Sequence, residues 1–230
     1  EFGLYLLWLN FYYPVFMNKI NFSEEKNLRI KALANNGKGC TKSFYNELMQ
    51  SKLGEKELIL EAFNFAKSIE YNHEGLSKES YLAHPLRVAS MSLRYIDDAT
   101  QNSIILALLH NIFEVGQVSR KVVKEKFGVI INDSISILTV NRELQWDSSY
   151  KEEYYSKIRG FPGPAMKIKV LDKFDNIFVI GLNPQEHIRI KYIKEVRKYI
   201  IPMSEIVLPE LSEAFEYACS MGEKSGYISK

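Results

Sequence analysis

The sequence has few cysteines, no excess of charge of one sign and no apolar run of membrane length. Its two cysteines, Cys40 and Cys219, lie far apart in the 230 residues and form no C-x-x-C pair. This scarcity excludes a disulfide framework and argues against a zinc ribbon, so we expect two buried thiols in a reducing cytoplasm. Thirty Lys and Arg residues against 28 Asp and Glu leave a formal net charge of +2. We therefore expect neither nucleic acid nor a membrane as a partner.

The N-terminal run, residues 1–16 (EFGLYLLWLNFYYPVF), is apolar but shorter than the ~20 residues that a membrane helix needs. It also lacks the basic segment and the small-residue cleavage site of a signal peptide. The first methionine is Met17, and polar residues follow it at once. We expect residues 1–17 to be an apolar extension upstream of a fold that begins near Asn18. A packed N-terminal arm is the alternative.

Helical periodicity dominates the rest of the chain, and strand patterns are hard to find. With 46% hydrophobic and 25% charged residues, the composition is that of a soluble globular protein. From Ser23 onward, apolar residues recur at intervals of three and four. The expected helices cover residues 55–70, a segment starting at His84-Pro85 and ending before Asp97-Asp98, 100–114, 119–127 closed by Gly128, 130–140, 150–158, 165–180, 185–199 and 204–220, the last bent or shifted by Pro209. This pattern predicts a single all-α domain over residues 18–230.

Polar residues on two of the most apolar helices are the first sign of a site. His110 and Glu114 are four residues apart in IILALLHNIFE, so a continuous helix would place them on one face. Asp172 and Asn176 have the same spacing in the second apolar segment. Burying such groups costs several kcal/mol unless something pairs with them, and a metal ion is an efficient partner.

If the two polar stripes face each other and His84 joins them, the donor set is two imidazoles, one carboxylate and one amide oxygen. Such a mixed nitrogen and oxygen site suits Mn²⁺, Fe²⁺, Mg²⁺ or Zn²⁺. A lone histidine on an apolar helix is more often a satisfied core residue than a ligand. The prediction of a metal site therefore depends on these residues occurring together.

Five segments, in order, resemble the HD-domain superfamily of metal-dependent phosphohydrolases, and within it the hydrolase domain of the RelA/SpoT proteins and the small alarmone hydrolases. AFNFAKSIEYNHEG is similar to the opening helix with its histidine, and SYLAHPLRVA looks like PYIxHPxxVA. ALLHNIFEV looks like ALLHDxxED, KFGVIINDSISILT like FGxxVxxxVxxxT, and IKVLDKFDNI like VKLADRLxNM. The likeness covers residues 55–180 and implies an HD-type helical bundle.

The resemblance implies a role for each matching residue. It assigns metal binding to His84, His110 and Asp172, with Asn111 at the position of the signature aspartate, and it makes Glu114 the residue that positions and activates the attacking water. On the substrate side we place Asn176, Lys78 and, at the rim, His73. In the family this site removes the 3′-pyrophosphate from (p)ppGpp with Mn²⁺, so the implied cofactor is a divalent metal, Mn²⁺ first.

The sequence departs from the family pattern in three places. Asn111 is neutral where the family has an aspartate, which lowers the expected attraction for a metal, and Val115 occupies the position of a second acid beside Glu114. The loop from His73 to His84 is short and lacks the family's Q-x-R-K cluster. Two hypotheses follow: a phosphohydrolase acting on a nucleotide or related phosphorylated small molecule, or a degenerate module that binds a nucleotide or a protein partner. Either is compatible with an oligomer.

Overall fold

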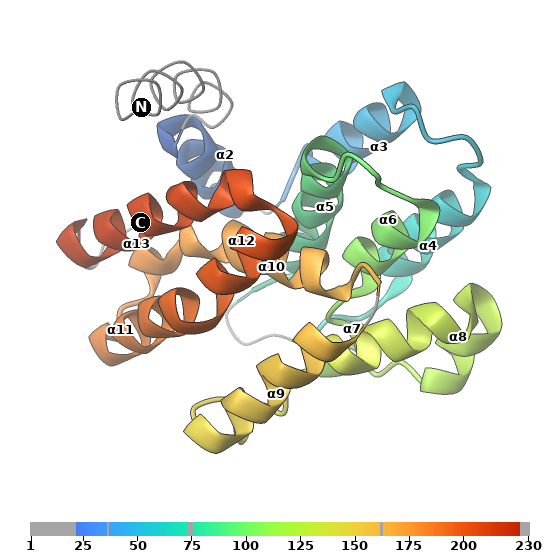
Figure 1. Ribbon diagram of the computed structural model, residues 1–230. Helices are drawn as coiled ribbons and strands as arrows, with labels where there is room; N and C mark the ends of the chain where they lie inside the picture. The colour runs from blue at the N-terminus through green and yellow to red at the C-terminus, as the bar shows by residue number, and fades with distance from the viewer. Residues whose placement is uncertain (1–21, 36, 73–75, 162, 226–230) are drawn as a thin grey trace, which may run out of the picture.

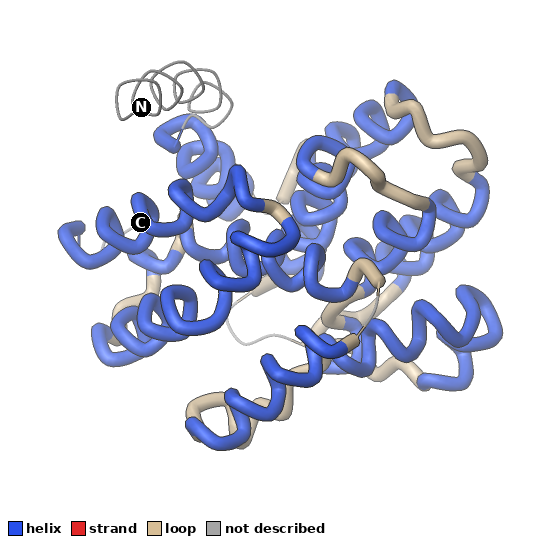
Figure 2. Tube along the Cα trace, viewed as in Figure 1, coloured by secondary structure: helices blue, strands red, loops and turns tan. Residues whose placement is uncertain are grey.

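The computed structural model describes residues 22–35, 37–72, 76–161 and 163–225, and Figures 1 and 2 show that these residues form helices joined by short loops. The α-helices are α2 (Phe22–Ala34), α3 (Cys40–Gln50), α4 (Glu57–Ser68), α5 (Lys78–Tyr95), α6 (Gln101–Leu109), α7 (Ile112–Val115), α8 (Arg120–Leu138), α9 (Ser148–Gly160), α10 (Ala165–Ile177), α11 (Glu186–Glu195), α12 (Ile201–Val207) and α13 (Ser212–Ser225). Short turns η2 (Ile180–Leu182), η3 (Val196–Ile200) and η4 (Pro209–Leu211) connect the last of them.

The predicted all-α class is confirmed. Within the described residues the only β-type pairing is an isolated bridge between Tyr71 and Gly116, and no helix there combines the length and apolarity needed to cross a bilayer. Cys219 is buried as expected, whereas Cys40 is half-buried, and both are free thiols. The expected extension over residues 1–17 lies outside the described residues.

Three central helices, α5, α6 and α10, pack against one another (Figure 1). The apolar run of α6 is the reason, because Ile104 through Leu109 are fully buried and this part of the helix has no solvent face. The Thr100 side chain caps its start by accepting the Ser103 N–H. The sequence-based expectation of central helices at residues 100–114 and 165–180 is thus confirmed for most of their length.

The predicted start of α5 at His84-Pro85 is wrong. The helix begins at Lys78, where Ser77 accepts the Ser80 N–H as its cap, and Pro85 lies inside it. An interior proline costs roughly 3 kcal/mol, but the first two turns bury Tyr81 and Leu82 in the core. The gain from this burial offsets the cost, and His84 is consequently held within a regular helix.

The helix predicted over residues 100–114 is interrupted at His110. Its ring Nδ1 lies 2.8 Å from the carbonyl oxygen of Ala107, which would accept the N–H of residue 111 if the helix continued. Asn111 has φ −119° and ψ 8°, and the chain restarts as the short helix α7. His110 and Glu114 therefore do not share one face of a continuous helix, contrary to the prediction.

Two further breaks follow the turn-forming residues of the sequence. Gly128 interrupts α8 with φ 87° and ψ 169°, so the predicted end of a helix there is confirmed. The helix expected over residues 204–220 is divided by the turn that starts at Pro209, which separates α12 from α13. Proline provides no N–H for a continuing helix and can begin a new one.

Candidate metal and substrate site

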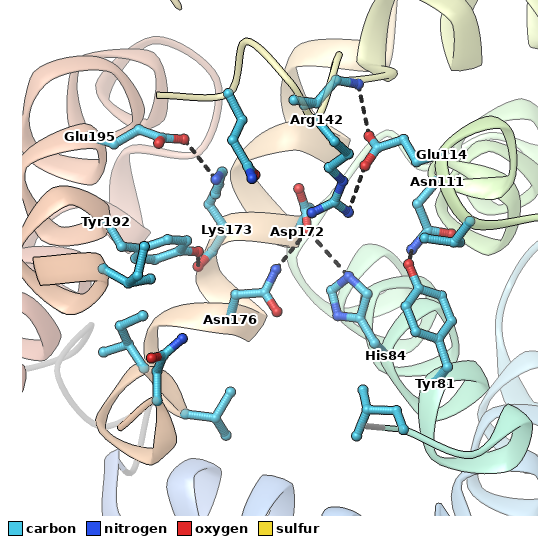
Figure 3. Close-up of a pocket in the computed structure, with 18 of the residues that line it drawn as sticks. Tyr81, His84, Asn111, Glu114, Arg142, Asp172, Lys173, Asn176, Tyr192 and Glu195 are labelled. Carbon is cyan, nitrogen blue, oxygen red and sulfur yellow. Dashed lines mark hydrogen bonds and ion pairs between the residues drawn. The ribbon is translucent and has the colours of Figure 1, made fainter. Parts of the chain in front are cut away.

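One cavity of about 1180 Å³ contains most of the predicted site residues (Figure 3). Its walls come from α5, the end of α6, α7, the turn over residues 141–147, and helices α9, α10 and α11. The predicted residues that line it are His84, His110, Asn111, Glu114, Asp172 and Asn176. Packing of α5 and α6 on α10 thus brings together groups up to 92 positions apart in the sequence (His84 to Asn176).

Two histidines and one aspartate form a compact cluster in this cavity. The ligand atoms of His84, His110 and Asp172 all lie within 4.8 Å of one another. Asp172 Oδ1 is 3.2 Å from His84 Nε2 and 3.8 Å from His110 Nε2. Both imidazoles therefore present their Nε2 atoms toward one carboxylate oxygen, an arrangement in which one small cation could contact all three groups.

The far side of the His84 ring is held by Asp175, which the sequence analysis missed. Asp175 is fully buried, and its Oδ2 lies 2.8 Å from His84 Nδ1. Arg87 donates to the same carboxylate through Nε and Nη2, and Arg29 of α2 pairs with its Oδ1 at 2.8 Å. A carboxylate behind a histidine orients the ring and selects the tautomer whose Nε2 carries a lone pair.

Burial and neighbouring charge set the protonation of the cluster. Burial lowers the pKa of His110 to about 4, so its ring is neutral at pH 7. Burial would raise the pKa of Asp172, but the adjacent Lys169 ammonium holds it well below its usual range. The cluster thus offers a neutral imidazole and an ionised carboxylate, the forms that bind metals.

Lys169 is a second residue that the sequence analysis missed. Its buried Nζ donates to Asp172 Oδ2 at 3.0 Å, and the adjacent Asn176 donates to Oδ1 at 2.9 Å. Asn176 therefore supports the carboxylate that faces the histidines. Charged residues on an otherwise apolar helix were the available signal for both Lys169 and Asp175, but only their tertiary partners show what each one does.

Two buried acceptor groups near the cluster have no hydrogen-bond partner among the described residues: His110 Nε2 and the Asn111 side-chain oxygen. The Asn111 amide nitrogen donates to the Tyr81 hydroxyl at 2.7 Å, which leaves the oxygen free to coordinate. Leaving a buried polar atom unpaired is costly. A divalent cation would satisfy such atoms, and the donor set of two imidazoles, one carboxylate and one amide oxygen fits one.

Glu114 approaches the cavity from α7, not from α6. Its Oε1 accepts the backbone N–H of Val140 at 2.9 Å, and its Oε2 pairs with Arg142 Nη2 at 2.8 Å. Val115, at the position of the family's second acid, is buried in the hydrophobic core. Glu114 is thus partnered by an arginine that the sequence analysis did not single out.

Of the two remaining predicted substrate residues, the structure describes only Lys78, which does not line this cavity. Lys78 pairs with Glu70 at 2.5 Å on the surface and is absent from the cavity wall. His73 lies outside the described residues. The fourth histidine of the chain, His187, is exposed on α11, as expected for a solvated helix face.

Two of three comparisons with known proteins found a similar protein. No protein-family model matches the chain. It is 27% identical over 150 residues to a guanosine-3′,5′-bis(diphosphate) 3′-pyrophosphohydrolase of Aquifex aeolicus, a match that covers 64% of this chain and 21% of that protein. The chain therefore spans about a fifth of the length of this relative.

A solved structure, described as a metazoan SpoT ortholog that hydrolyzes ppGpp, superposes with a TM-score of 0.59 at 16% identity. The superposition covers 76% of this chain and 99% of that one, and at this identity it shows a shared fold. Together with the ordered motifs from residue 55 to residue 180, these likenesses relate the chain to the RelA/SpoT-type hydrolases of the HD-domain superfamily.

Proposed function

We propose that this chain is a divalent-metal-dependent phosphohydrolase acting on a nucleotide or a related phosphorylated small molecule, with (p)ppGpp as the first candidate. The observation that carries the proposal is the convergence of ligand atoms from His84, His110 and Asp172 within 4.8 Å, in a cavity that Glu114 also lines. The two comparison proteins, both described by hydrolysis of ppGpp-type compounds, support the substrate class.

His84, His110 and Asp172 would hold the metal, with Asn111 as a neutral fourth ligand. Mn²⁺ is our first candidate because the family resemblance implies it. A bound divalent cation lowers the pKa of water and neutralises charge on phosphoryl oxygens. The Asn111 amide in place of a carboxylate provides less electrostatic attraction, so we expect weaker metal binding than an aspartate would give.

Glu114 is the residue we assign to the attacking water. It would orient the water and accept its proton as the new P–O bond forms and the bond from phosphorus to the leaving ester oxygen breaks. The leaving oxygen then takes a proton from solvent. Asn176 acts one step away, because its amide holds the Asp172 carboxylate in place.

Metal content of the purified protein after dialysis against Mn²⁺ tests the first part of this proposal. We expect near-stoichiometric Mn²⁺ in the wild type and a loss of it in both His110→Ala and His84→Ala, with His187→Ala as the matched control on an exposed helix face. Thermal unfolding of each variant verifies that it is folded. Metal retained in both folded site variants would contradict the proposal.

Phosphate release from (p)ppGpp and from other nucleotides tests the second part. We expect Mn²⁺-dependent release by the wild type and its loss in Glu114→Gln, since the glutamine cannot take a proton from water. Mn²⁺ binding with no release from any nucleotide tested would argue against an enzyme and for the second candidate below.

A degenerate module that binds a nucleotide or a protein partner is that second candidate. It is favoured by the neutral Asn111, whose amide already contacts Tyr81, and by the missing second acid at Val115. Because Val115 is a core residue, Asn111→Asp is a cleaner reversal than a change at both positions. A sharp rise in Mn²⁺ affinity and in phosphate release in Asn111→Asp would identify Asn111 as the residue that silences the site. No gain would mean that the pocket itself has diverged.

A further inference from the structure

The cavity wall carries several cations, and one of them differs from the rest. Three buried or nearly buried lysines each form an ion pair with a carboxylate, namely Lys151, Lys169 and Lys173. Arg142, on the turn over residues 141–147, lines the same cavity with its side chain 52% exposed. Its guanidinium is thus the cationic group of the described wall that is most accessible to a bound molecule.

Arg142 reaches from the turn toward Glu114 and into the cavity that His84 and Asp172 also line (Figure 3). One nitrogen, Nη2, lies 2.8 Å from Glu114 Oε2. Among the described residues Glu114 is its only ion-pair partner. Since a guanidinium carries five N–H donors in a planar fork, most of the donors of Arg142 remain available.

We propose that Arg142 binds a phosphate group of the substrate, and that this binding releases Glu114 for its work on water; the inference rests on the proposed function. A phosphate accepts two parallel hydrogen bonds from arginine and carries more charge than one carboxylate. It therefore competes well for Arg142, because solvent around this half-exposed side chain weakens its ion pair with Glu114. The ligand class is a phosphate or pyrophosphate ester.

Glu114 keeps a hydrogen-bond partner when Arg142 leaves it. Its side chain is 7% exposed, and a buried carboxylate stripped of every partner would be destabilised. When Arg142 turns to the phosphate, Oε1 still accepts the Val140 N–H, and Oε2 becomes free to accept from water. Because Val115 adds no second carboxylate beside Glu114, Arg142 needs to break only its ion pair with Glu114 to bind a phosphate.

Binding of inorganic pyrophosphate, measured by calorimetry on protein dialysed against Mn²⁺, tests the inference without turnover. We expect Arg142→Ala to weaken binding roughly 10- to 100-fold, the range expected for hydrogen bonds to a charged group. Glu114→Gln should tighten binding, because it frees Arg142, and Glu114→Gln combined with Arg142→Ala should return to the affinity of Arg142→Ala alone. Arg142→Lys, which keeps the charge but not the fork, should lie in between.

Arg159→Ala is the matched control, because Arg159 pairs loosely with Glu152 at 3.9 Å on α9 and does not line the cavity. Its pyrophosphate affinity should equal that of the wild type. The inference is overturned if Arg142→Ala binds pyrophosphate as the wild type does, if Glu114→Gln gains nothing, or if the wild type binds no pyrophosphate. Mn²⁺ content is measured separately, so normal metal loading with an unchanged Arg142→Ala affinity would overturn this inference and leave the proposed function standing.

Discussion

At the scale of single residues, Asp175 shows how a buried charge can support a site that it does not enter. Its carboxylate is fully buried between His84 on one side and Arg29 and Arg87 on the other. Burial would raise the pKa of Asp175, but the two guanidinium groups hold it well below its usual range. The carboxylate is therefore ionised at neutral pH and can accept the Nδ1–H of His84, which directs Nε2 toward Asp172.

Replacing Asp175 by asparagine should weaken metal binding and reduce stability. We expect Mn²⁺ affinity to fall roughly 10- to 100-fold, as for other residues behind a ligating histidine. The free energy of unfolding should drop by about 3–5 kcal/mol, because the charges of Arg29 and Arg87 lose their buried partner. Metal titration and denaturant unfolding measure the two effects.

The control is Asp97→Asn, which removes an exposed carboxylate from the loop after α5. It should change neither quantity. The proposed role in positioning His84 would be wrong if folded Asp175→Asn bound Mn²⁺ as tightly as the wild type. Nitrogen NMR of the His84 ring gives a separate check, since loss of the Asp175 acceptor should alter its tautomer balance.

At the scale of elements, Gly128 decides where α8 turns. Its φ of 87° and ψ of 169° lie in a region that is accessible almost only to glycine, and a Cβ there would meet no atom within 4 Å. The requirement is thus one of backbone conformation and not of space. Gly128→Ala should lower the free energy of unfolding by about 1–3 kcal/mol, measured by denaturant unfolding.

Gly160→Ala provides the comparison at the end of α9. No atom lies within 4 Å of its would-be Cβ, and Gly160 has no positive φ. Alanine favours a helix over glycine by up to about 1 kcal/mol, so this variant should be neutral or slightly more stable. Equal losses in the two variants would show that the conformation of Gly128 is not what matters.

At the scale of the whole molecule, Glu195 joins three helices on the side of the cavity away from α6. From α11 it accepts from Lys151 and Tyr155 of α9 and from Lys173 of α10. Burial would raise the pKa of Glu195, but the lysines lower it from its usual 4.5 to about 2. The folded protein therefore favours the ionised form.

This low pKa predicts a pH dependence of stability. Because the folded pKa is depressed, the contribution of Glu195 is fully present above about pH 4.5 and is lost as the pH falls toward 2. Glu195→Gln should cost on the order of 3 kcal/mol at pH 7, and its stability should fall less steeply than that of the wild type between these pH values. Unfolding measured across the acid range tests this.

The exposed Glu143→Gln is the control, and its pH profile should follow the wild type. A Glu195→Gln profile parallel to that of the wild type would mean that Glu195 does not titrate as described. The ion pairs of Glu195 would then contribute nothing specific to the packing of α9, α10 and α11.

Much of the fold, and the core of the candidate site, could be predicted from the sequence because both depend on local patterns. Apolar spacing predicts the central helices at residues 100–114 and 165–180, and a polar group inside such a run, such as His110 or Asp172, is visible because burying it requires a partner. The ends of these helices were less predictable. Pro85 lies inside α5 because core burial offsets its cost, and α6 ends where the His110 side chain takes the Ala107 carbonyl.

The sequence by itself thus determined an all-α chain with metal-capable residues in family order. Only the tertiary structure decided how those residues are used, since hydrogen bonds and ion pairs act over about 3 Å and join residues far apart in the chain. Asp175 reaches His84 across 91 positions, and Arg142 reaches Glu114 from a turn that no periodicity describes. Such partners are set by how α5, α7 and α10 pack, and the composition of each segment alone does not contain that information.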